Sequence, residues 1–149
     1  MSERCWALIL AAGAGERLGH GRPKAFTPLG GRPLASWSVR AFARHGAITD
    51  LLVVMPPDWE SSLANQMLDI LADGLEDDAV KVRGAVTGGA RRQDSVRLGL
   101  EALWEIVAHD GAGASAASPA DPAEHPEARD LLVLVHDAAR PIVPARVID

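Results

Sequence analysis

The residues best suited to chemistry lie near the start of the chain, where a glycine-rich stretch carries cations. Leu10-Ala11-Ala12-Gly13-Ala14-Gly15-Glu16-Arg17-Leu18-Gly19 follows a continuous apolar run, and Arg22-Pro23-Lys24 closes it. An apolar run of this length is typical of a buried strand. Backbone N–H groups without side-chain bulk can close on phosphate oxygens, and arginine and lysine can neutralise their charge. The segment therefore predicts a loop that surrounds a nucleoside triphosphate.

Two well-known phosphate-binding loops do not match this stretch. A dinucleotide fingerprint needs glycine at its first, third and sixth positions, and the sixth position counted from Gly13 is Leu18. A Walker loop needs Gly-Lys followed by Ser or Thr, and no glycine of this chain precedes a lysine. The alternative at this point is a tight strand-to-helix turn with incidental charges.

A second motif lies in the middle of the chain, after an apolar run at residues 80–86. It reads Gly88-Gly89-Ala90-Arg91-Arg92-Gln93-Asp94-Ser95-Val96. Glycines, cations and a hydroxyl at the N-terminus of a helix can hold a base, a ribose or a phosphate. The alternative is that Asp94 and Ser95 only cap the helix that follows.

The third motif, Val135-His136-Asp137-Ala138-Ala139-Arg140-Pro141, follows the last apolar run at residues 131–135. Open parallel sheets place their ligands at the carboxyl ends of their strands, which is where this motif falls. Asp137 can bind Mg²⁺ that bridges phosphate oxygens, or a ribose, because a buried strand end does not carry an unpaired carboxylate without cause. His136 can act as a catalytic base, but we favour a hydrogen-bonded structural histidine.

Size and composition limit the classes of protein that fit. A chain of 149 residues suits one domain, residues 1–149, and almost half of the residues are apolar, enough for a core. The net charge of −5 argues against a nucleic-acid partner, and clustered cations suit a small anionic ligand.

Cys5 is the only cysteine, so we expect a reducing, cytoplasmic location. The N-terminal apolar run is at the lower length limit for an export signal, and no stretch is long enough to span a membrane.

Four short apolar runs alternate with segments of helical periodicity. The runs lie at residues 6–11, 51–55, 80–86 and 131–135, and the helical segments at 34–45, 59–75 and about 94–107. This alternation predicts an α/β fold with three layers, α/β/α, and a mostly parallel, Rossmann-like sheet. The run at residues 131–135 lacks polar alternation, so we expect it to be buried on both faces. The Ala-, Gly- and Pro-rich stretch at about 110–129 is interpreted as a flexible surface insertion.

Together the three motifs resemble one family, the 2-C-methyl-D-erythritol 4-phosphate cytidylyltransferases, whose nucleotidyltransferase fold is of the GT-A-like type. The likeness rests on Ala-Ala-Gly-x-Gly-x-Arg with Pro-Lys, on Gly-Gly-x-x-Arg-x-Asp-Ser-Val and on Val-His-Asp-Ala-Ala-Arg-Pro, and it runs from about residue 5 to residue 149 outside the insertion. The related pentitol-phosphate cytidylyltransferases share much of this pattern and are an alternative. Enzymes that make sugar nucleotides or a guanylylated molybdenum cofactor look similar in the first motif, but the third motif points away from them.

The resemblance implies a reaction of non-mevalonate isoprenoid biosynthesis, in which 2-C-methyl-D-erythritol 4-phosphate attacks the α-phosphorus of CTP and pyrophosphate leaves, with Mg²⁺ as cofactor. By motif, Arg17 and Lys24 would stabilise the charge that grows on the α-phosphate. Asp137 would face Mg²⁺ and the phosphates, and Arg140 would contact the second substrate, a polyol phosphate. The nucleotide-binding positions of the family correspond here to Ala11, Ala12, Gly13, Gly15, Gly89, Ala90, Ser95, Asp137 and Ala138.

Two features depart from the family pattern. Ala25 stands where the family usually has glutamine after Pro-Lys, a minor change because Lys24 is kept. The family also continues for several strands and helices beyond this length, and that remainder supplies substrate-positioning residues and the arm of its homodimer. The chain therefore resembles the N-terminal portion of the family's domain, and a catalytically incomplete CTP-binding fragment is a second alternative. We expect its last apolar strand to leave a hydrophobic edge that makes the protein marginally stable or self-associating.

Overall fold

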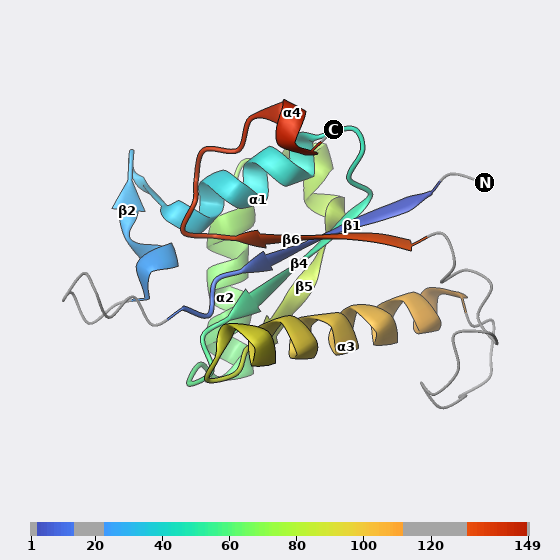
Figure 1. Ribbon diagram of the computed structural model, residues 1–149. Coiled ribbons are helices and arrows are strands. Elements are labelled where there is room, and N and C mark those ends of the chain that lie inside the picture. The colour runs from blue at the N-terminus through green and yellow to red at the C-terminus, as the bar shows by residue number, and fades with distance from the viewer. Residues whose placement is uncertain (1–2, 14–22, 112–130, 149) are drawn as a thin grey trace.

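The computed structural model describes residues 3–13, 23–111 and 131–148, and its centre is a parallel sheet (Figure 1). The sheet contains β1 (Arg4–Leu10), β4 (Asp50–Met55), β5 (Val82–Thr87) and β6 (Leu131–Asp137), in the order β5-β4-β1-β6. Every adjacent pair of these strands is parallel. Two shorter strands, β2 (Pro28–Leu29) and β3 (Arg32–Pro33), form a separate antiparallel hairpin. The predicted α/β fold with a mostly parallel sheet is confirmed.

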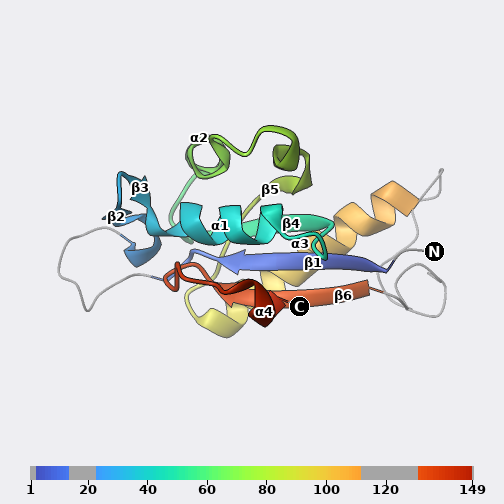
Figure 2. The same cartoon turned by 90° about the horizontal axis from the view of Figure 1, so that it is seen from above.

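Helices cover both faces of the sheet, which gives the three predicted layers (Figures 1 and 2). α1 (Leu34–Arg44) and α2 (Ser61–Ala72) lie on one face, and the long α3 (Arg92–Gly111) lies on the other. The other described helices are short: the 3-10 turns η2 (Lys24–Phe26) and η3 (Glu76–Lys81), and α4 (Ala145–Ile148). Within the described ranges, no helix has the length and apolar character needed to cross a membrane.

β1 belongs to two hydrophobic cores because its residues alternate between the faces of the sheet. Its odd-numbered residues from Cys5 to Ile9 pack with α1 and α2, and its even-numbered residues from Trp6 to Leu10 pack with α3. All of them are buried. A strand that is buried on both faces has a continuous apolar sequence, which explains why this run shows no polar alternation.

β6 is an edge strand, and this corrects the expectation that residues 131–135 are buried on both faces. Among the described strands it pairs with β1 alone. Leu132 is 56% exposed and Val135 is 41% exposed. These two residues are in register with Cys5 and Leu8, which belong to opposite cores, so each face of β6 carries an exposed apolar side chain. An apolar run indicates a strand but does not tell whether the helices reach far enough to cover it.

Other boundaries differ by a few residues from the predicted ones. β5 begins at Val82, because the residues before it form the 3-10 turn η3. α2 ends at Ala72 rather than at residue 75. α3 continues to Gly111, so Asp110 is helical rather than part of the predicted insertion. The remainder of that insertion lies outside the described residues.

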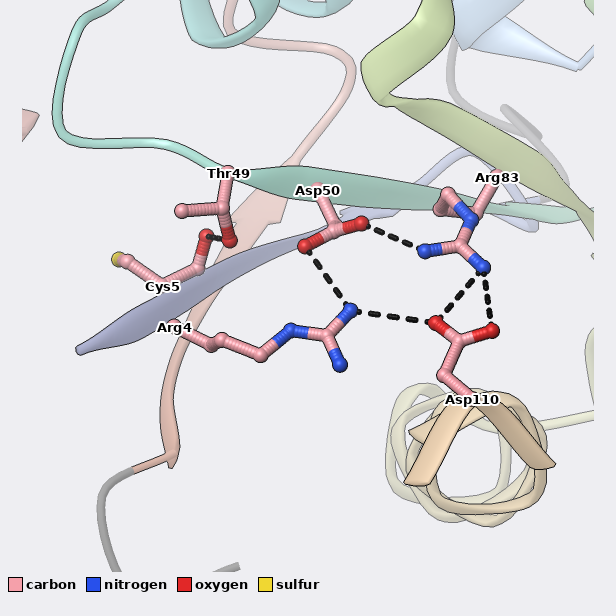
Figure 3. A network of polar contacts seen from close by, with 6 residues as sticks. All are labelled: Arg4, Cys5, Thr49, Asp50, Arg83 and Asp110. Carbon is pink, nitrogen blue, oxygen red and sulfur yellow. Dashed lines mark hydrogen bonds and ion pairs between the residues drawn. The ribbon is translucent and has the colours of Figure 1, made fainter. Parts of the chain in front are cut away.

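Two arginines and two aspartates connect the last turn of α3 to the amino-terminal ends of β1, β4 and β5 (Figure 3). Arg83, at the start of β5, donates to Asp50 Oδ1 at 2.8 Å and to Asp110 Oδ2 at 2.8 Å. Arg4, at the start of β1, donates to Asp50 Oδ2 and to Asp110 Oδ2, each at 3.3 Å. Both guanidinium groups lie over the ring of buried Trp6, 5.7 and 5.6 Å from its centroid, which is a cation–π distance. This network, hereafter the four-residue network, closes the amino-terminal edge of the sheet.

Candidate functional site

A cavity of about 690 Å³ opens at the opposite edge, where the parallel strands end. It is lined by the ends of β1 and β6, by η2, by the loop after β4 and by the start of α3. β1 is flanked here by β4 on one side and by β6 on the other, so this is the point at which the strand order reverses. Open α/β sheets bind ligands at such a point, and the volume is typical of a small-molecule site.

The first motif supplies backbone to this cavity. Ala12 and Gly13 line the cavity directly after β1. Ala11 is buried behind them, where its N–H donates to Val54 O at 2.8 Å and continues the pairing of β1 with β4. Ala11 therefore supports the wall rather than facing the cavity. Gly15 and Arg17 lie outside the described residues, so their predicted roles stay predictions.

Lys24 lies at the cavity on the short turn η2. Its side chain is exposed, whereas the next residue but one, Phe26, is buried. The ring of Phe26 lies 4.6 Å from that of Trp59, with the two planes inclined by 44°. Trp59 directly follows Asp58 in the loop after β4, which also lines the cavity. An aromatic pair thus holds two cavity segments together and fixes the backbone of Lys24, while its ammonium group stays accessible.

The glycines of the second motif are required by close approach between the turn after β5 and its neighbours. A Cβ atom on Gly88 would lie 2.7 Å from Ala12 Cβ and 2.7 Å from Ser95 Oγ, closer than van der Waals contact allows. The N–H of Gly88 donates to Met55 O at 2.7 Å. Without side chains, this turn can pack directly against the loop of the first motif and bring the two motifs to one cavity.

Ser95 lines the cavity but is almost fully buried, and its hydroxyl accepts the N–H of Gly89 at 3.1 Å. Ser95 therefore holds the shape of the turn in which Gly89 and Ala90 line the cavity. Asp94, in the first turn of α3, accepts the N–H of Arg91 at 3.2 Å, which is the reciprocal half of a capping box. Asp94 thus caps the helix, as the predicted alternative describes, whereas Gly89, Arg91 and Arg92 line the cavity.

The third motif places Asp137 at the cavity and Ala138 behind the cavity wall. Asp137 lines the cavity, and Ala138 is buried beside it, with its N–H donated to Leu10 O at 2.8 Å. Ala138 thus fixes the end of β6 against β1 rather than contacting the cavity. Arg140 follows at the rim, exposed and lining the cavity.

His136 points away from the cavity, toward α1. Its Nε2 lies 3.1 Å from the carbonyl oxygen of Arg140 and 3.1 Å from Ser38 Oγ, and its ring lies 5.0 Å from that of Phe42. Because a carbonyl oxygen can only accept, this geometry fits the tautomer that carries hydrogen on Nε2. Burial lowers the pKa of His136, although the Arg140 carbonyl and Asp137 oppose that shift. The prediction of a hydrogen-bonded structural histidine is confirmed.

Sequence reasoning missed one group of cavity residues and gave no individual role to another. Pro56, Pro57 and Asp58 line the cavity because they follow β4, whose end lies beside that of β1. The rule that parallel strands end at one edge could have found them, since residues 51–55 were expected to form a strand. Arg91 and Arg92 also line the cavity. Both lie inside the second motif, whose cations were expected to hold a ligand, but neither arginine was given a role of its own.

Arg92 makes the direct ion pair of the cavity. Its Nε lies 3.2 Å from Asp137 Oδ1, so the pair joins the start of α3 to the end of β6. The Arg92 side chain is 63% exposed and that of Asp137 is 37% exposed. The pair therefore links the second and third motifs across the cavity.

The charges around the cavity favour an anionic ligand. Four cations line the described part of it, against two carboxylates, in a protein whose net charge is −5. The cations are Lys24, Arg91, Arg92 and Arg140, and the carboxylates are Asp58 and Asp137. The first turn of α3 adds backbone N–H groups that have no partner within the helix.

The donor set fits Mg²⁺ only in company with a polyphosphate. Among the described residues, no group of three or more His, Cys, Asp or Glu could hold a metal ion. Asp137 offers one carboxylate inside the cavity, already in contact with a cationic side chain. Mg²⁺ is commonly bound by one or two carboxylates together with substrate phosphates and water. The cavity therefore suits an ion that enters with its ligand's phosphates.

Comparison with known proteins gives a consistent result. Residues 5–124 match the sequence profile of the family "IspD: 2-C-methyl-D-erythritol 4-phosphate cytidylyltransferase". The chain is 41% identical over 146 residues to the 2-C-methyl-D-erythritol 4-phosphate cytidylyltransferase of Streptomyces coelicolor, covering 98% of this chain and 44% of that protein. It is 35% identical over 143 residues to the bifunctional enzyme IspD/IspF of Rhodospirillum rubrum, covering 96% of this chain and 29% of that protein.

Solved structures show the same fold. The crystal structure of 4-diphosphocytidyl-2C-methyl-D-erythritol synthase from Anaerococcus prevotii superposes with a TM-score of 0.60 at 23% identity, over 99% of this chain and 48% of that one. A further crystal structure of such a synthase gives a TM-score of 0.58 at 24% identity, over 99% and 52%. The chain thus spans 44 to 52% of the length of the Streptomyces relative and the two solved structures, and 29% of the bifunctional enzyme.

Proposed function

This chain belongs to the 2-C-methyl-D-erythritol 4-phosphate cytidylyltransferase family, and on that premise we propose that its cavity binds CTP and that the protein transfers CMP to 2-C-methyl-D-erythritol 4-phosphate. The observation that carries the proposal is the surplus of cations around one cavity of an acidic protein. A field of this sign attracts a ligand with several negative charges, as a nucleoside triphosphate has.

In the proposed reaction, an oxygen of the acceptor's phosphate attacks the α-phosphorus of CTP. A new P–O bond forms while the bond from the α-phosphorus to the oxygen bridging to the β-phosphate breaks, and that electron pair leaves with pyrophosphate. The protein takes little part in covalent chemistry, so its contribution is positioning and the stabilisation of charge.

Lys24 is proposed to stabilise the negative charge that increases on the α-phosphate in the transition state. Its ammonium group is accessible to a ligand, and the packing of Phe26 against Trp59 holds the turn that carries it. A positive charge at this place can stabilise the negative charge that develops during the reaction. Arg17 is proposed to act with Lys24, since its planar guanidinium can contact two oxygens at once.

The nucleotide is proposed to lie between the first and second motifs. Ala12 and Gly13 would contact the phosphates through their backbone, and Gly89 and Ala90 would contact the cytidine. Ser95 would act indirectly, because its hydroxyl already holds Gly89.

Asp137 is the residue proposed to hold Mg²⁺, whose charge, when bound, would neutralise the phosphate oxygens. Arg140, exposed at the rim, is proposed to contact the phosphate of the acceptor. The acceptor named here follows the family, and a pentitol phosphate is the alternative. We also propose a cytoplasmic location, which the unpaired, buried Cys5 supports.

The test is release of pyrophosphate from CTP and Mg²⁺ with 2-C-methyl-D-erythritol 4-phosphate as acceptor, with ribitol 5-phosphate in a parallel reaction. Pyrophosphate release that depends on the first acceptor supports the transferase. A rise in melting temperature with CTP but no turnover supports a CTP-binding module instead. Competition by GTP or TTP as strong as that by CTP would contradict the proposed base preference.

A further inference from the structure

Two cavity residues of opposite charge are paired with each other, and one of them is the proposed ligand of the metal ion. Arg92 contacts Asp137 at 3.2 Å, and both line the cavity. Asp137 is the proposed ligand for a divalent cation, and Arg92 is a cation beside the space proposed for the triphosphate. The guanidinium therefore occupies one of the two carboxylate oxygens through which Asp137 could bind the metal ion, and its charge opposes that of the ion.

The side chain of Arg92 is longer and more exposed than that of Asp137, so it can move farther. Its side chain is 63% exposed and begins α3, so rotation about its side-chain bonds can turn the guanidinium toward a phosphate. Asp137 ends β6, in register with Leu10, and the next residue is hydrogen-bonded to Leu10 O. If Arg92 leaves Asp137 for a phosphate, it is therefore the arginine side chain that moves.

We propose that Arg92 couples the binding of nucleotide to the binding of the divalent cation, a role that rests on the proposed function. Without nucleotide, Arg92 holds Asp137 and competes with the cation. When a triphosphate enters, its oxygens draw Arg92 away from Asp137 and leave the carboxylate to the cation. Each ligand then strengthens the binding of the other by the same factor, as linkage requires.

The neighbouring arginine provides a matched comparison. Arg91 also lines the cavity and carries the same charge, but its guanidinium lies 3.6 Å from Asp94 of its own turn. Loss of Arg91 changes the field in the cavity without freeing Asp137. Comparison of variants at Arg91 and Arg92 therefore distinguishes an exchange of ion-pair partners from a general effect of positive charge in the cavity.

The experiment measures binding of Mn²⁺ alone by electron paramagnetic resonance, and of CTP with and without Mn²⁺ by calorimetry. In Arg92→Gln, the affinity for Mn²⁺ alone should rise about two- to fivefold, the range expected when an exposed ion pair is lost. The affinity for CTP without the cation should fall, and the factor by which each ligand aids the other should shrink. Arg91→Gln should raise the affinity for Mn²⁺ less, and Arg92→Lys should keep most of the coupling.

Two results would overturn the proposal, and they differ from a failure of the proposed function. If Arg92→Gln binds Mn²⁺ no more tightly than Arg91→Gln, or keeps the full coupling, the exchange is wrong although CTP still binds. If the unmodified protein binds no CTP at all, the proposed function fails and the coupling fails with it.

Discussion

The two edges of the same sheet carry two charged clusters with opposite organisation. At the amino-terminal edge, the four-residue network joins Arg4 and Arg83 to Asp50 and Asp110, and each arginine contacts both carboxylates (Figure 3). At the carboxyl-terminal edge, cations outnumber carboxylates around an open cavity. The first cluster is balanced in charge and the second is not.

This difference separates stability from function. Charges that are partly removed from water are stable when they are paired and hydrogen-bonded, as the four-residue network is. In that network, hydrogen bonding by Arg83 holds the pKa of Asp110 below its ordinary value. An unbalanced set of charges is retained where a ligand supplies the missing partner. The comparison predicts that substitutions at the two edges change different properties.

The largest effect is expected for Lys24→Ala at the cavity. Turnover should fall about 10²- to 10³-fold, because the charge that Lys24 meets increases in the transition state, while CTP affinity should change by about tenfold at most. Steady-state kinetics and calorimetry measure the two quantities. Lys81→Ala, the same change at the chain's other lysine, is the control: Lys81 bonds Ala43 O at 2.7 Å, so its loss should lower stability but not turnover. Equal losses of turnover and affinity in Lys24→Ala would contradict the assignment.

Gly88→Ala should lower both stability and CTP affinity. Its new Cβ atom would meet Ala12 Cβ, Ser95 Oγ and the carbonyl oxygen of Met55, which cannot rotate away, at a cost of about 2 to 3 kcal/mol. Gly99→Ala is the matched variant, because its Cβ would meet Leu8 and Val54 side chains in the α3 core. Urea unfolding and calorimetry should show that Gly99→Ala loses stability alone. The same loss of CTP affinity in both variants would contradict the expectation that Gly88 shapes the cavity and Gly99 only the core.

Asp50→Asn should destabilise the fold and leave CTP affinity unchanged. It removes a nearly buried carboxylate from two arginines, at an expected cost of about 1 to 2 kcal/mol, because both arginines are partly exposed and keep Asp110. Asp58 is an exposed carboxylate at the cavity, so Asp58→Asn should change CTP affinity without altering the urea midpoint. A change in CTP affinity for Asp50→Asn would show that the two edges are not independent.

The smallest effect is expected from the titration of His136. Since burial lowers its pKa in the folded protein, the unfolded chain binds the proton first as pH falls below 6.5. The stability that the neutral ring contributes is therefore complete above pH 6.5 and is lost as pH falls toward the folded pKa. Melting temperatures from pH 7.5 to 5.0 should decline less steeply in His136→Gln than in the unmodified protein. If the melting temperatures of the two proteins decline in parallel, titratable groups other than His136 cause the decline.

The sequence predicted those parts of the site that depend on chain order. Each motif follows an apolar run, and parallel strands end at one edge, so Gly13, Gly89 and Asp137 were expected to meet and all line the cavity. The Arg92–Asp137 pair could not be predicted, because it depends on side-chain direction across a gap of 45 residues.

Burial was the other property that the sequence left open. Leu132 and Leu8 look alike in their apolar runs, but Leu8 lies on a central strand and Leu132 on an edge strand. The four-residue network could not be predicted either. Nothing in the sequence around Asp50 or Asp110 indicates that the fold brings these two carboxylates to the same pair of arginines. Local patterns fix the type of an element, and only the assembled sheet fixes its neighbours.

Trp59 is an internal fluorophore, and its ring packs against Phe26 on the short turn that also carries Lys24. Indole emission shifts in colour and intensity with the polarity and mobility of its surroundings. A ligand that draws η2 and the loop after β4 together will therefore change the tryptophan spectrum without any added dye. Trp59 is one of four tryptophans, so the part of the change that disappears in Trp59→Phe is the part that follows the wall of the cavity.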